Sequence, residues 1–243
     1  MSAFYGELAR WWPLISPLED YAGEAAELAR VLREAAPHAT TLLELGCGGG
    51  HVAAYLKRDF TLTLTDLSEP MLEVSRRLNP ECEHLAGDMR TLELRREFDG
   101  VFVHDAIDYM LSATDLSAAI ATAYRHCRPG GVALFVPDVV KETFAPSTEA
   151  GGADAPDGSG VRYLEWCYDP DPNDTVANTH YLFATREADG RVQHHAEVHE
   201  HGLFPREIWL QLLAAAGFRV SVLTERTDEE REPRLLFLAR KAG

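Results

Sequence analysis

The sequence predicts an α/β protein in which buried parallel strands alternate with helices, and two observations indicate this class. Short apolar runs recur along the chain, separated by segments with helical periodicity or helix-capping residues. The first run leads directly into a glycine-rich turn, Gly46–Gly50, and the segment after it, His51–Arg58, is expected to be a helix. The strands expected in this sheet lie at residues 41–45, 61–65, 83–90, 98–103 and 132–136.

Composition bounds the partners and the location of the protein. The 243 residues suffice for one large domain, or for one domain with an insertion, and 46% hydrophobic residues can fill its core. The 23 basic residues face 39 acidic ones, and this net charge of -16 argues against a nucleic-acid partner. No apolar run approaches the roughly 18 residues of a membrane span, and the chain starts without a secretion signal. We therefore expect no membrane partner and a cytoplasmic location.

The first 36 residues are expected to form an aromatic and helical segment. An apolar stripe at helical spacing covers residues 22–35, and Pro37 ends it. Large rings are costly to expose, so the aromatic side chains must pack on the core or form a lid over a pocket. The sequence leaves both alternatives open. The rings belong to Phe4, Tyr5, Trp11, Trp12 and Tyr21.

The glycine-rich turn indicates a ligand site, because glycines let a ligand approach the backbone closely. Two nucleotide interpretations are disfavoured. The turn Gly46–Gly50 lacks the third spacing of G-x-G-x-x-G, and it ends in His51 where a phosphate loop has lysine. Glu44 lies two residues before the first glycine. A carboxylate at that position suits a positively charged ligand better than a phosphate.

Polar residues follow two of the predicted strands, at the edge where ligands of open α/β sheets bind. Asp66 ends the strand 61–65, and its carboxylate can accept hydrogen bonds from two ribose hydroxyls. Ser68 then caps the helix 69–78. The strand 98–103 delivers further polar residues to the same edge, and we expect chemistry there. These residues are His104, Asp105, Asp108 and Tyr109.

The second half of the chain combines the end of the sheet with an insertion. A helix at 116–128 ends at an Arg-Pro-Gly-Gly turn before the fifth strand. Residues 145–160 are rich in glycine, alanine and aspartate, which predicts a flexible loop that is either a lid or without function. Alternating, aromatic-rich segments at 161–168, 175–186 and 191–203, with a turn at 188–190, predict an antiparallel sheet inserted between strands five and six.

The chain closes with a helix and two strands. The helix covers 205–216, and the strands 218–223 and 234–239 are expected to complete the sheet as an antiparallel pair, joined by a solvated acidic turn at 228–230. The core is thus expected to comprise residues 37–144 and 203–243. The insertion, residues 161–202, is expected to cover the substrate site.

Four histidines cluster in the last inserted strand. His195, His199 and His201 share one face with Glu197, which raises a metal hypothesis. Alternate residues along one strand, however, spread over roughly 13 Å at ~3.3 Å per residue, too far to close on one ion unaided. Two alternatives remain open. Either some of these histidines and His194 face a substrate cavity, where a neutral imidazole can accept a proton, or they face solvent.

Several motifs resemble those of class I methyltransferases that use S-adenosylmethionine. The pattern E/D-x-G-x-G-x-G is similar to their cofactor loop and occurs here as Glu44, Gly46, Gly48 and Gly50. The Arg-Pro-Gly-Gly turn adds to the resemblance, which covers most of the chain. A narrower likeness, carried by residues 19–25, 87–90 and 198–204, is to small-molecule members of natural-product pathways, most closely to N,N-dimethyltransferases of nucleotide-linked aminosugars.

This resemblance implies a Rossmann-like seven-stranded mixed sheet with strand 7 antiparallel, and S-adenosyl-L-methionine as the cofactor. Its methionine part would meet Tyr21, Glu44 and the loop, its ribose Asp66, and its adenine Asp88 and Met89, and Leu67 is expected to contact the cofactor as well. His104 is expected beside the cofactor as well. The loop residues concerned are Gly46, Cys47, Gly48 and Gly50. The acids after strand four and the Gly-Gly-Gly sequence of the loop depart from the family pattern.

Methyl transfer is an in-line displacement at a carbon activated by the sulfonium charge, so the protein chiefly aligns the acceptor with the methyl group, and no metal is required. We expect transfer to a nitrogen or an oxygen of a small molecule. His104, Tyr109 and His199 are the candidate catalytic residues. Alternatives are a protein or RNA methyltransferase, a non-catalytic cofactor-binding member of the fold, and a dehydrogenase. The inserted sheet could also support a homodimer.

Overall fold

The central sheet has seven strands in the order β10–β11–β5–β4–β1–β2–β3. The computed structural model describes residues 3–226 and 233–243. Strands β1 to β5 are parallel, and β11 pairs antiparallel with both β5 and β10, which confirms the predicted sheet and its antiparallel strand. The strands are β1 (Thr41–Leu45), β2 (Thr61–Asp66), β3 (Glu83–Ala86), β4 (Phe98–Val103), β5 (Cys127–Phe135), β10 (Phe218–Thr224) and β11 (Leu235–Lys241).

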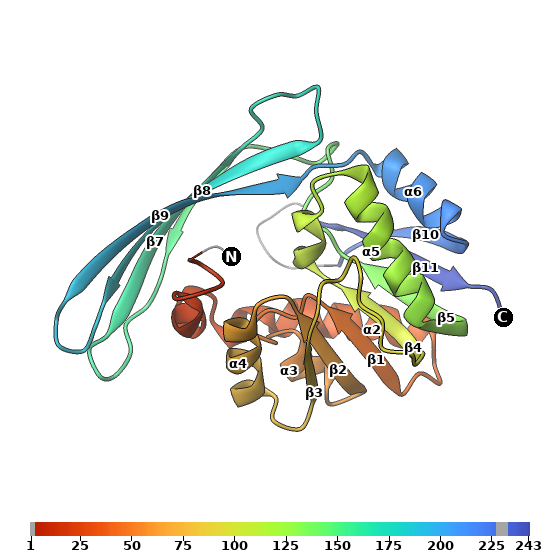
Figure 1. Cartoon of the computed structure of the whole chain (residues 1–243), viewed down its shortest axis with the longest axis horizontal. Helices are drawn as coiled ribbons and strands as arrows, with labels where there is room; N and C mark the ends of the chain where they lie inside the picture. Colours follow the sequence, from red (N-terminus) through yellow and green to blue (C-terminus); the bar gives the residue numbers. More distant parts are fainter. Residues whose placement is uncertain (1–2, 227–232) are drawn as a thin grey trace.

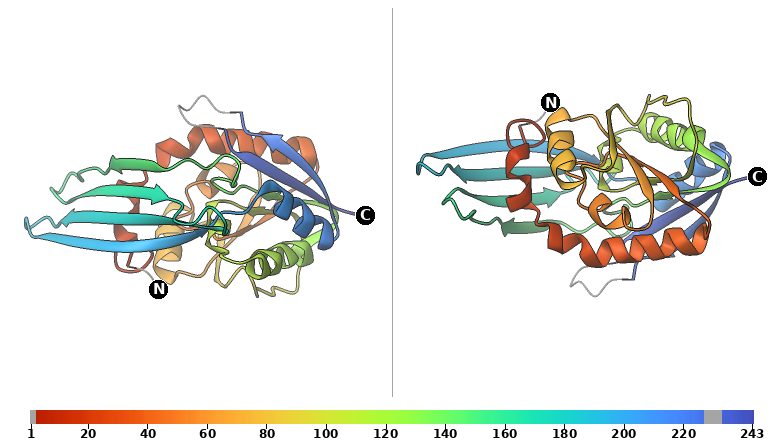
Figure 2. Two further views of the ribbon diagram at one scale, coloured as in Figure 1. Left: turned by 90° about the horizontal axis from the view of Figure 1, so that it is seen from above. Right: turned by 90° about the horizontal axis from the view of Figure 1, so that it is seen from below.

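Helices cover both faces of this sheet, because successive side chains of each buried strand point to opposite faces. Leu43, Val101 and Ala133 pack in the cluster beneath α5 (Ala113–His126) and α6 (Arg206–Ala215). The neighbouring residues Leu42 and Phe102 pack on the other face, against α2 (Ala22–Ala35) and α3 (Ala53–Leu56). Figure 2 shows α2 and α5 on opposite sides of the strands. None of the described helices is long and apolar enough to cross a membrane.

A second sheet of four antiparallel strands extends from the core between β5 and β10 (Figure 1). Its strands are β6 (Ser147–Gly151), β7 (Gly160–Tyr168), β8 (Val176–Arg186) and β9 (Val192–Gly202). The last three agree with the predicted insertion. Strand β6 does not, because no strand was predicted within the loop 145–160. Its short, exposed side chains carry no apolar pattern, and it pairs with β7 through the backbone at the edge of the sheet.

The N-terminal segment lies between the inserted sheet and the core (Figure 1). It contains η1 (Ala9–Trp11), α1 (Trp12–Ile15) and η2 (Leu18–Tyr21). Phe4, Leu8 and Trp11 are buried in one cluster with Tyr181 and Phe183 of β8. These aromatic residues therefore bury much of their surface against the insertion, whereas the sequence offered packing on the core or a lid over a pocket.

Three further elements differ from expectation at their ends. The helix after the glycine turn is only α3, four residues long, where 51–58 was predicted. Helix α5 begins after Ser112, whose hydroxyl accepts the amide of Asp115, so the predicted start at 116 was one turn late. Strand β5 already begins at Cys127, which pairs with Phe98, and the Pro-Gly-Gly segment forms an irregularity in register before Val132 pairs with Gly100.

One helix near the site agrees with expectation, and one short element there was not predicted. Ser68 caps α4 (Glu69–Leu78) by accepting the amide of Met71, as predicted. A short 3-10 helix, η3 (Asp105–Tyr109), follows β4. The predicted acidic turn at 228–230 lies outside the described residues.

Candidate functional site

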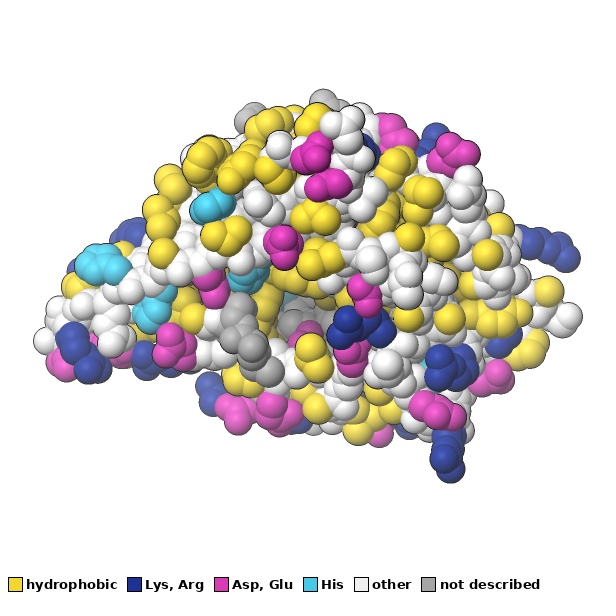
Figure 3. Space-filling view, turned by 45° about the horizontal axis from the view of Figure 1, so that its top comes forward, with side chains coloured by type: hydrophobic (Ala, Val, Ile, Leu, Met, Phe, Trp, Pro, Cys, Tyr) yellow, Lys and Arg dark blue, Asp and Glu magenta, His cyan; other side chains and the backbone are white. Residues whose placement is uncertain are grey.

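The carboxyl ends of β1, β2, β4 and β5 meet at one edge of the central sheet, facing the inserted sheet (Figure 1). The molecular surface is hollowed between the inserted sheet and the core, and acidic side chains lie around this hollow (Figure 3). We call the hollow the cleft. Most predicted site residues lie in loops at this edge, as expected for an open α/β sheet.

The glycine loop after β1 has a backbone that other residues could not adopt without strain. Gly46, Gly48 and Gly50 have φ values of +78°, +52° and +73°. A Cβ at Gly46 would lie 2.3 Å from Cβ of Ala106, because the turn after β4 passes directly over the loop. A Cβ at Gly50 would lie 2.2 Å from Oγ of Ser75 on α4. The loop is thus fixed by close packing from two sides.

Glu44 is buried beneath this loop, at the end of β1. Its Oε2 has no hydrogen-bond partner among the described residues. Burial raises the pKa of Glu44 to about 8, opposed by the charge of His104 and supported by that of Asp66. A buried carboxylate that lacks partners is costly, and a bound ammonium group would relieve that cost. Glu44 therefore fits the cationic ligand predicted for it.

Asp66 connects β2 with the glycine loop, and its carboxylate can still accept hydrogen bonds from a ligand. Its Oδ2 accepts the amide of Gly48 at 2.8 Å, and its Oδ1 accepts the amide of Ser68 at 2.8 Å. Each oxygen of a carboxylate has about two acceptor sites, so each can still accept a hydroxyl. The next side chain, Leu67, is 64% exposed, an unusual position for a large apolar residue unless a flat apolar group covers it.

Asp88 and Met89, the predicted adenine contacts, lie at the same edge, but Asp88 already binds Arg90. Both oxygens of Asp88 contact Arg90, with Oδ2 2.6 Å from Nη2, and Arg90 lowers the pKa of Asp88. Asp88 could bind an exocyclic amine only while sharing its carboxylate with Arg90. The methyl group of Met89 lies close to Gly46, so Met89 borders the glycine loop as predicted.

Tyr21 and Cys47 also lie beside the loop. The Tyr21 hydroxyl is 2.7 Å from Oγ of Ser16, and its ring is 5.2 Å from the ring of His51. Trp12 donates to Nδ1 of His51 at 3.1 Å, so the N-terminal segment closes over the helix end of the loop. Burial raises the pKa of Cys47 well above its usual range, which leaves a neutral thiol that acts as a packing residue.

His104 belongs to a buried cluster of charges rather than to an open acceptor site. Its Nε2 lies 2.7 Å from Oε1 of Glu24, and its Nδ1 lies 3.1 Å from Oδ1 of Asp105. Arg234 contacts Glu24 and His104 from the edge of β11. Burial would lower the pKa of His104, but Asp105 and Glu24 outweigh it and raise the pKa to about 9. A histidine already protonated near neutral pH holds a position and cannot take up a proton there.

Tyr109 and His199 lie together, as the prediction of a shared acceptor site requires. The Tyr109 hydroxyl is 2.8 Å from Nδ1 of His199 and 2.7 Å from the hydroxyl of Tyr5. Burial lowers the pKa of His199 and raises that of Tyr109, so both are neutral near pH 7. Nε2 of His199 is buried, and Oε1 of Glu197 lies 3.3 Å from it. If Nδ1 donates to Tyr109, Nε2 carries no proton and can accept one once a ligand separates it from Glu197.

The other histidines of β9 occupy both faces of the inserted sheet. His195, His199 and His201 pair with Phe183, Thr179 and Ala177 on the inward face, whereas His194 is exposed on the outward face. Nδ1 of His201 lies 3.2 Å from Oγ1 of Thr179, and burial lowers the pKa of His201 to about 4. Within the described parts of the chain, no three histidine, cysteine or acidic side chains are grouped to hold a metal ion.

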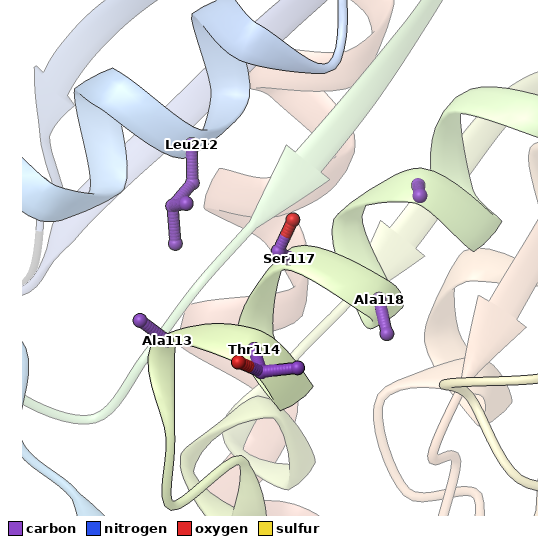
Figure 4. Close-up of a pocket in the computed structure, with 6 residues that line it drawn as sticks. Ala113, Thr114, Ser117, Ala118 and Leu212 are labelled. Carbon is purple, nitrogen blue, oxygen red and sulfur yellow. The ribbon is translucent and has the colours of Figure 1, made fainter.

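Several site residues escaped prediction from the sequence. Tyr5 was noted only as one of several early aromatics. Glu24 and Arg234 carried no local signal, because they meet His104 only through the fold, and Asp138 joins this cluster through Arg234. A separate depression of about 510 Å³ lies between α5 and α6 (Figure 4). Alanine, serine, threonine and leucine side chains line it, so it offers no acid or base.

Comparison with known proteins accounts for this arrangement. Residues 42–131, which contain the glycine loop and Asp66, match the family described as methyltransferase domain. The chain is 32% identical over 224 residues to dTDP-3-amino-3,6-dideoxy-alpha-D-glucopyranose N,N-dimethyltransferase from Streptomyces fradiae, covering 90% of this chain and 87% of that protein.

Two solved structures extend the likeness to the inserted sheet. DesVI from Streptomyces venezuelae superimposes with a TM-score of 0.80 at 29% identity, covering 92% of each chain. The S-adenosylmethionine complex of CalS10, an amino pentose methyltransferase from Micromonospora echinaspora, gives a TM-score of 0.74 at 26% identity over 90% of each chain.

Proposed function

The chain belongs to the family of S-adenosylmethionine-dependent methyltransferases that includes the aminosugar N,N-dimethyltransferases, and from this premise we propose that it methylates the amino group of a small aminosugar-like acceptor. That the enzyme uses S-adenosylmethionine and a small-molecule acceptor follows from its family. The choice of nitrogen over oxygen and the roles of individual residues are our proposal.

The pair formed by Tyr109 and His199 carries this proposal. The two side chains come from the core and from the insertion, and they meet over the cleft in neutral form. An amine needs little activation beyond loss of its proton, whereas a hydroxyl needs a strong base to become nucleophilic. A neutral imidazole is adequate for the amine. Among the described groups that face the cleft, none is a base strong enough to make a hydroxyl nucleophilic.

Different residues would bind different parts of the cofactor. When bound, S-adenosylmethionine supplies a methyl group on a positively charged sulfur. Glu44 would hold the ammonium end, Asp66 the ribose hydroxyls and Leu67 one face of the adenine, with Asp88 and Met89 at its edge. The glycine loop lets the backbone approach the ligand, and Tyr21 closes the methionine end.

On the acceptor side, the protein orients the nucleophile and manages one proton. Nε2 of His199 would take the proton from the acceptor nitrogen, which leaves a lone pair for attack. Tyr109 fixes the ring of His199, and Tyr5 fixes Tyr109. His104 would position the turn after β4 through Glu24 and Asp105. The inserted sheet and the N-terminal segment would restrict access of water, which strengthens these interactions.

We further propose a homodimer formed by the outward face of the inserted sheet, in a protein of the cytoplasm that binds no nucleic acid. Four large apolar side chains lie exposed on or beside that face, and an apolar patch of this kind often marks an interface. The residues are Leu164, Trp166, Leu182 and Val198. The net charge of -16 supports the absence of a nucleic-acid partner.

The proposed function is tested by methyl transfer to matched acceptors. A 3-amino-3-deoxyhexose, offered as a methyl glycoside and as its nucleoside-diphosphate derivative, is incubated with the protein and isotopically labelled cofactor. Mass spectrometry and NMR should locate the label on nitrogen. A label on a hydroxyl oxygen, or no labelling of either amine by protein that binds the cofactor, would refute N-methylation of an aminosugar.

A further inference from the structure

Glu197 lies on the inward face of β9, on the side of the inserted sheet that packs against aromatic residues of the N-terminal segment. Its side chain is 15% exposed, and its pairing partner on β8 is Tyr181. A carboxylate that is largely buried is costly unless hydrogen bonds satisfy it. The amides of β8 and β9 bond to each other along the ladder, so Glu197 needs donors from another part of the chain.

The start of the N-terminal segment supplies these donors. Oε2 of Glu197 accepts the amide of Ala3 at 2.9 Å, and Oε1 accepts the amide of Phe4 at 2.7 Å. Both bonds are charge-assisted, which is the stronger class of hydrogen bond in proteins. The ring of Phe4 lies 5.0 Å from the rings of Tyr181 and Phe183. Glu197 thus docks residues 3 and 4 on the inserted sheet.

Tyr5, the next residue, is held between this anchor and the core. Its carbonyl accepts the hydroxyl of Ser68, the cap of α4, and its own hydroxyl lies 2.7 Å from that of Tyr109. The rings of Tyr5 and Tyr109 meet edge-on, at 5.6 Å and 85°. Because Tyr5 directly follows Phe4, the position of its hydroxyl depends on how Glu197 docks the chain.

These contacts form a closed circuit. It runs from Glu197 through the amide of Phe4 to Tyr5, on to Tyr109 and to Nδ1 of His199, and from Nε2 of His199 back to Oε1 of Glu197 at 3.3 Å. Its members come from the N-terminal segment, from η3 and from β9. In such a network the geometry of each member depends on the others. Loss of Glu197 should therefore disturb Tyr109 and His199 from two sides.

We propose that Glu197 is a positioning residue of the acceptor site, which docks the N-terminal segment on the inserted sheet so that Tyr5 holds Tyr109 and His199 in place. Glu197 acts through these residues and takes no part in proton or methyl transfer itself. This inference rests on the proposed function, which assigns the acceptor site to Tyr109 and His199. The sequence suggested the inward acid of β9 only as a metal ligand.

The chemistry makes such positioning effective. Methyl transfer needs the acceptor nitrogen, the methyl carbon and the sulfur in line, so a small displacement of the groups that hold the acceptor costs a large factor in rate. The cofactor side has separate contacts, since Trp12 donates to His51 and Asp66 accepts the amide of Gly48. Loss of Glu197 should therefore slow transfer and leave the affinity for the cofactor unchanged.

A double-mutant cycle in the full-length protein tests this role. Initial rates with saturating S-adenosylmethionine and a nucleoside-diphosphate-linked 3-amino-3-deoxyhexose give kcat, and calorimetry counts the sites that bind the cofactor. Glu197→Gln keeps the size of the side chain but offers one acceptor oxygen in place of two. We expect kcat per cofactor-binding site to fall about tenfold. In a Tyr5→Phe background, which lacks the hydroxyl that Glu197 positions, the same substitution should lower kcat by about twofold or less.

Hydrogen exchange gives a readout that needs no turnover. The amides of residues 3–6 should exchange about tenfold faster in Glu197→Gln than in the wild type. Glu187→Gln is the matched control, because Glu187 follows β8 and contacts Arg10 of the same N-terminal segment. Arg10 is 56% exposed, and an exposed ion pair contributes little. Both kcat and exchange should stay near their wild-type values in this control.

An equal loss of kcat from Glu197→Gln in the wild-type and Tyr5→Phe backgrounds would overturn the inference. Unchanged exchange at residues 3–6 would overturn it too, as would an equal effect of Glu187→Gln. A purely structural role would reduce the number of cofactor-binding sites and leave kcat per site unchanged, which is a further contrary result. The proposed function fails separately: a label on oxygen in the wild type refutes N-methylation, while the cycle on that reaction still decides the role of Glu197.

Discussion

The hydroxyl of Tyr109 lies 2.8 Å from Nδ1 of His199 and so joins the core to the inserted sheet. The two residues are 90 positions apart. Neither the turn after β4 nor strand β9 forms an acceptor site alone. The ring of His199 is thus held at both nitrogens, by Tyr109 of the core at Nδ1 and by Glu197 of its own strand, whose Oε1 lies 3.3 Å from Nε2.

Tyr109→Phe and His199→Ala should therefore slow methyl transfer without lowering the affinity for the cofactor. We expect kcat to fall about 10- to 100-fold in His199→Ala, because a positioned proton acceptor is lost, and less in Tyr109→Phe, which removes only its orientation. Initial rates with saturating acceptor measure this effect, and calorimetry checks cofactor affinity. His194→Ala, on the exposed face of the same strand, is the matched control. Unchanged turnover in His199→Ala would disprove the proposed role.

His104→Gln should change how stability depends on pH. The folded pKa of about 9 lies above the ordinary value of 6.5, so the protonated histidine stabilises the fold below pH 6.5, and this contribution is lost as pH rises through 9. It is on the order of 2–3 kcal/mol. Urea unfolding at pH 6.5 should find the variant less stable than the wild type, with the two converging above pH 9.

Other groups in that window make the difference between the two proteins the informative quantity. Glu44, Asp105 and Glu165 also have raised pKa values, of about 8, 7 and 7, and they too reduce stability as pH rises. Glu165 does not interact with His104 and cancels in the comparison, whereas the pKa values of Glu44 and Asp105, which the charge of His104 lowers, should rise further in the variant. A constant difference between wild type and variant from pH 6 to 10 would show that His104 is neutral in the fold.

Asp66→Ala should abolish most of the cofactor affinity. It removes two potential hydrogen bonds to ribose and the two that hold the amides of Gly48 and Ser68, each charge-assisted bond contributing about 1.5–3 kcal/mol. We expect the calorimetric heat of cofactor binding to disappear at micromolar protein. Asp66→Asn keeps part of the acceptor capacity and should lose less. Wild-type affinity in Asp66→Ala would refute the ribose assignment.

Sequence and structure agree best where the function is local in the chain. Glu44, the glycines and Asp66 were predictable because one strand, one turn and the next strand end place them at one edge. The contacts of His104 with Glu24 and Arg234 were not, since they depend on how α2 and β11 pack beside β4. Strand β6 was missed because backbone pairing with β7 stabilises it, and its side chains carry no periodic signal.

Trp166→Asp should convert the proposed homodimer to a monomer. Trp166 is 49% exposed on the outward face, which also carries Leu164 and Leu182, so the substitution would place a charge in the apolar part of the proposed interface. Light scattering coupled to gel filtration measures the mass, and Asp189→Asn serves as a control that changes charge elsewhere. A wild-type protein that is monomeric at high micromolar concentration would dismiss the homodimer.

Glu44→Gln should remove the part of the pH dependence of S-adenosylmethionine affinity that comes from the titration of Glu44. In the protein without ligand, burial raises the pKa of Glu44 to about 8, so this carboxyl is largely protonated at pH 6.5 and ionised above pH 8. The ligand is a cation and should bind the ionised form more tightly. The wild-type affinity should therefore rise between pH 6.5 and 8.5 relative to that of the variant.

The difference between the two proteins matters because the amino group of the ligand titrates in the same range, at about 8. That contribution is common to both and cancels. Without ligand, the variant should also be the more stable protein above pH 8, because it no longer buries an unpaired carboxylate. Parallel affinity profiles for wild type and Glu44→Gln would mean that Glu44 does not bind the ammonium group, and that the acid before the glycine loop acts only through packing.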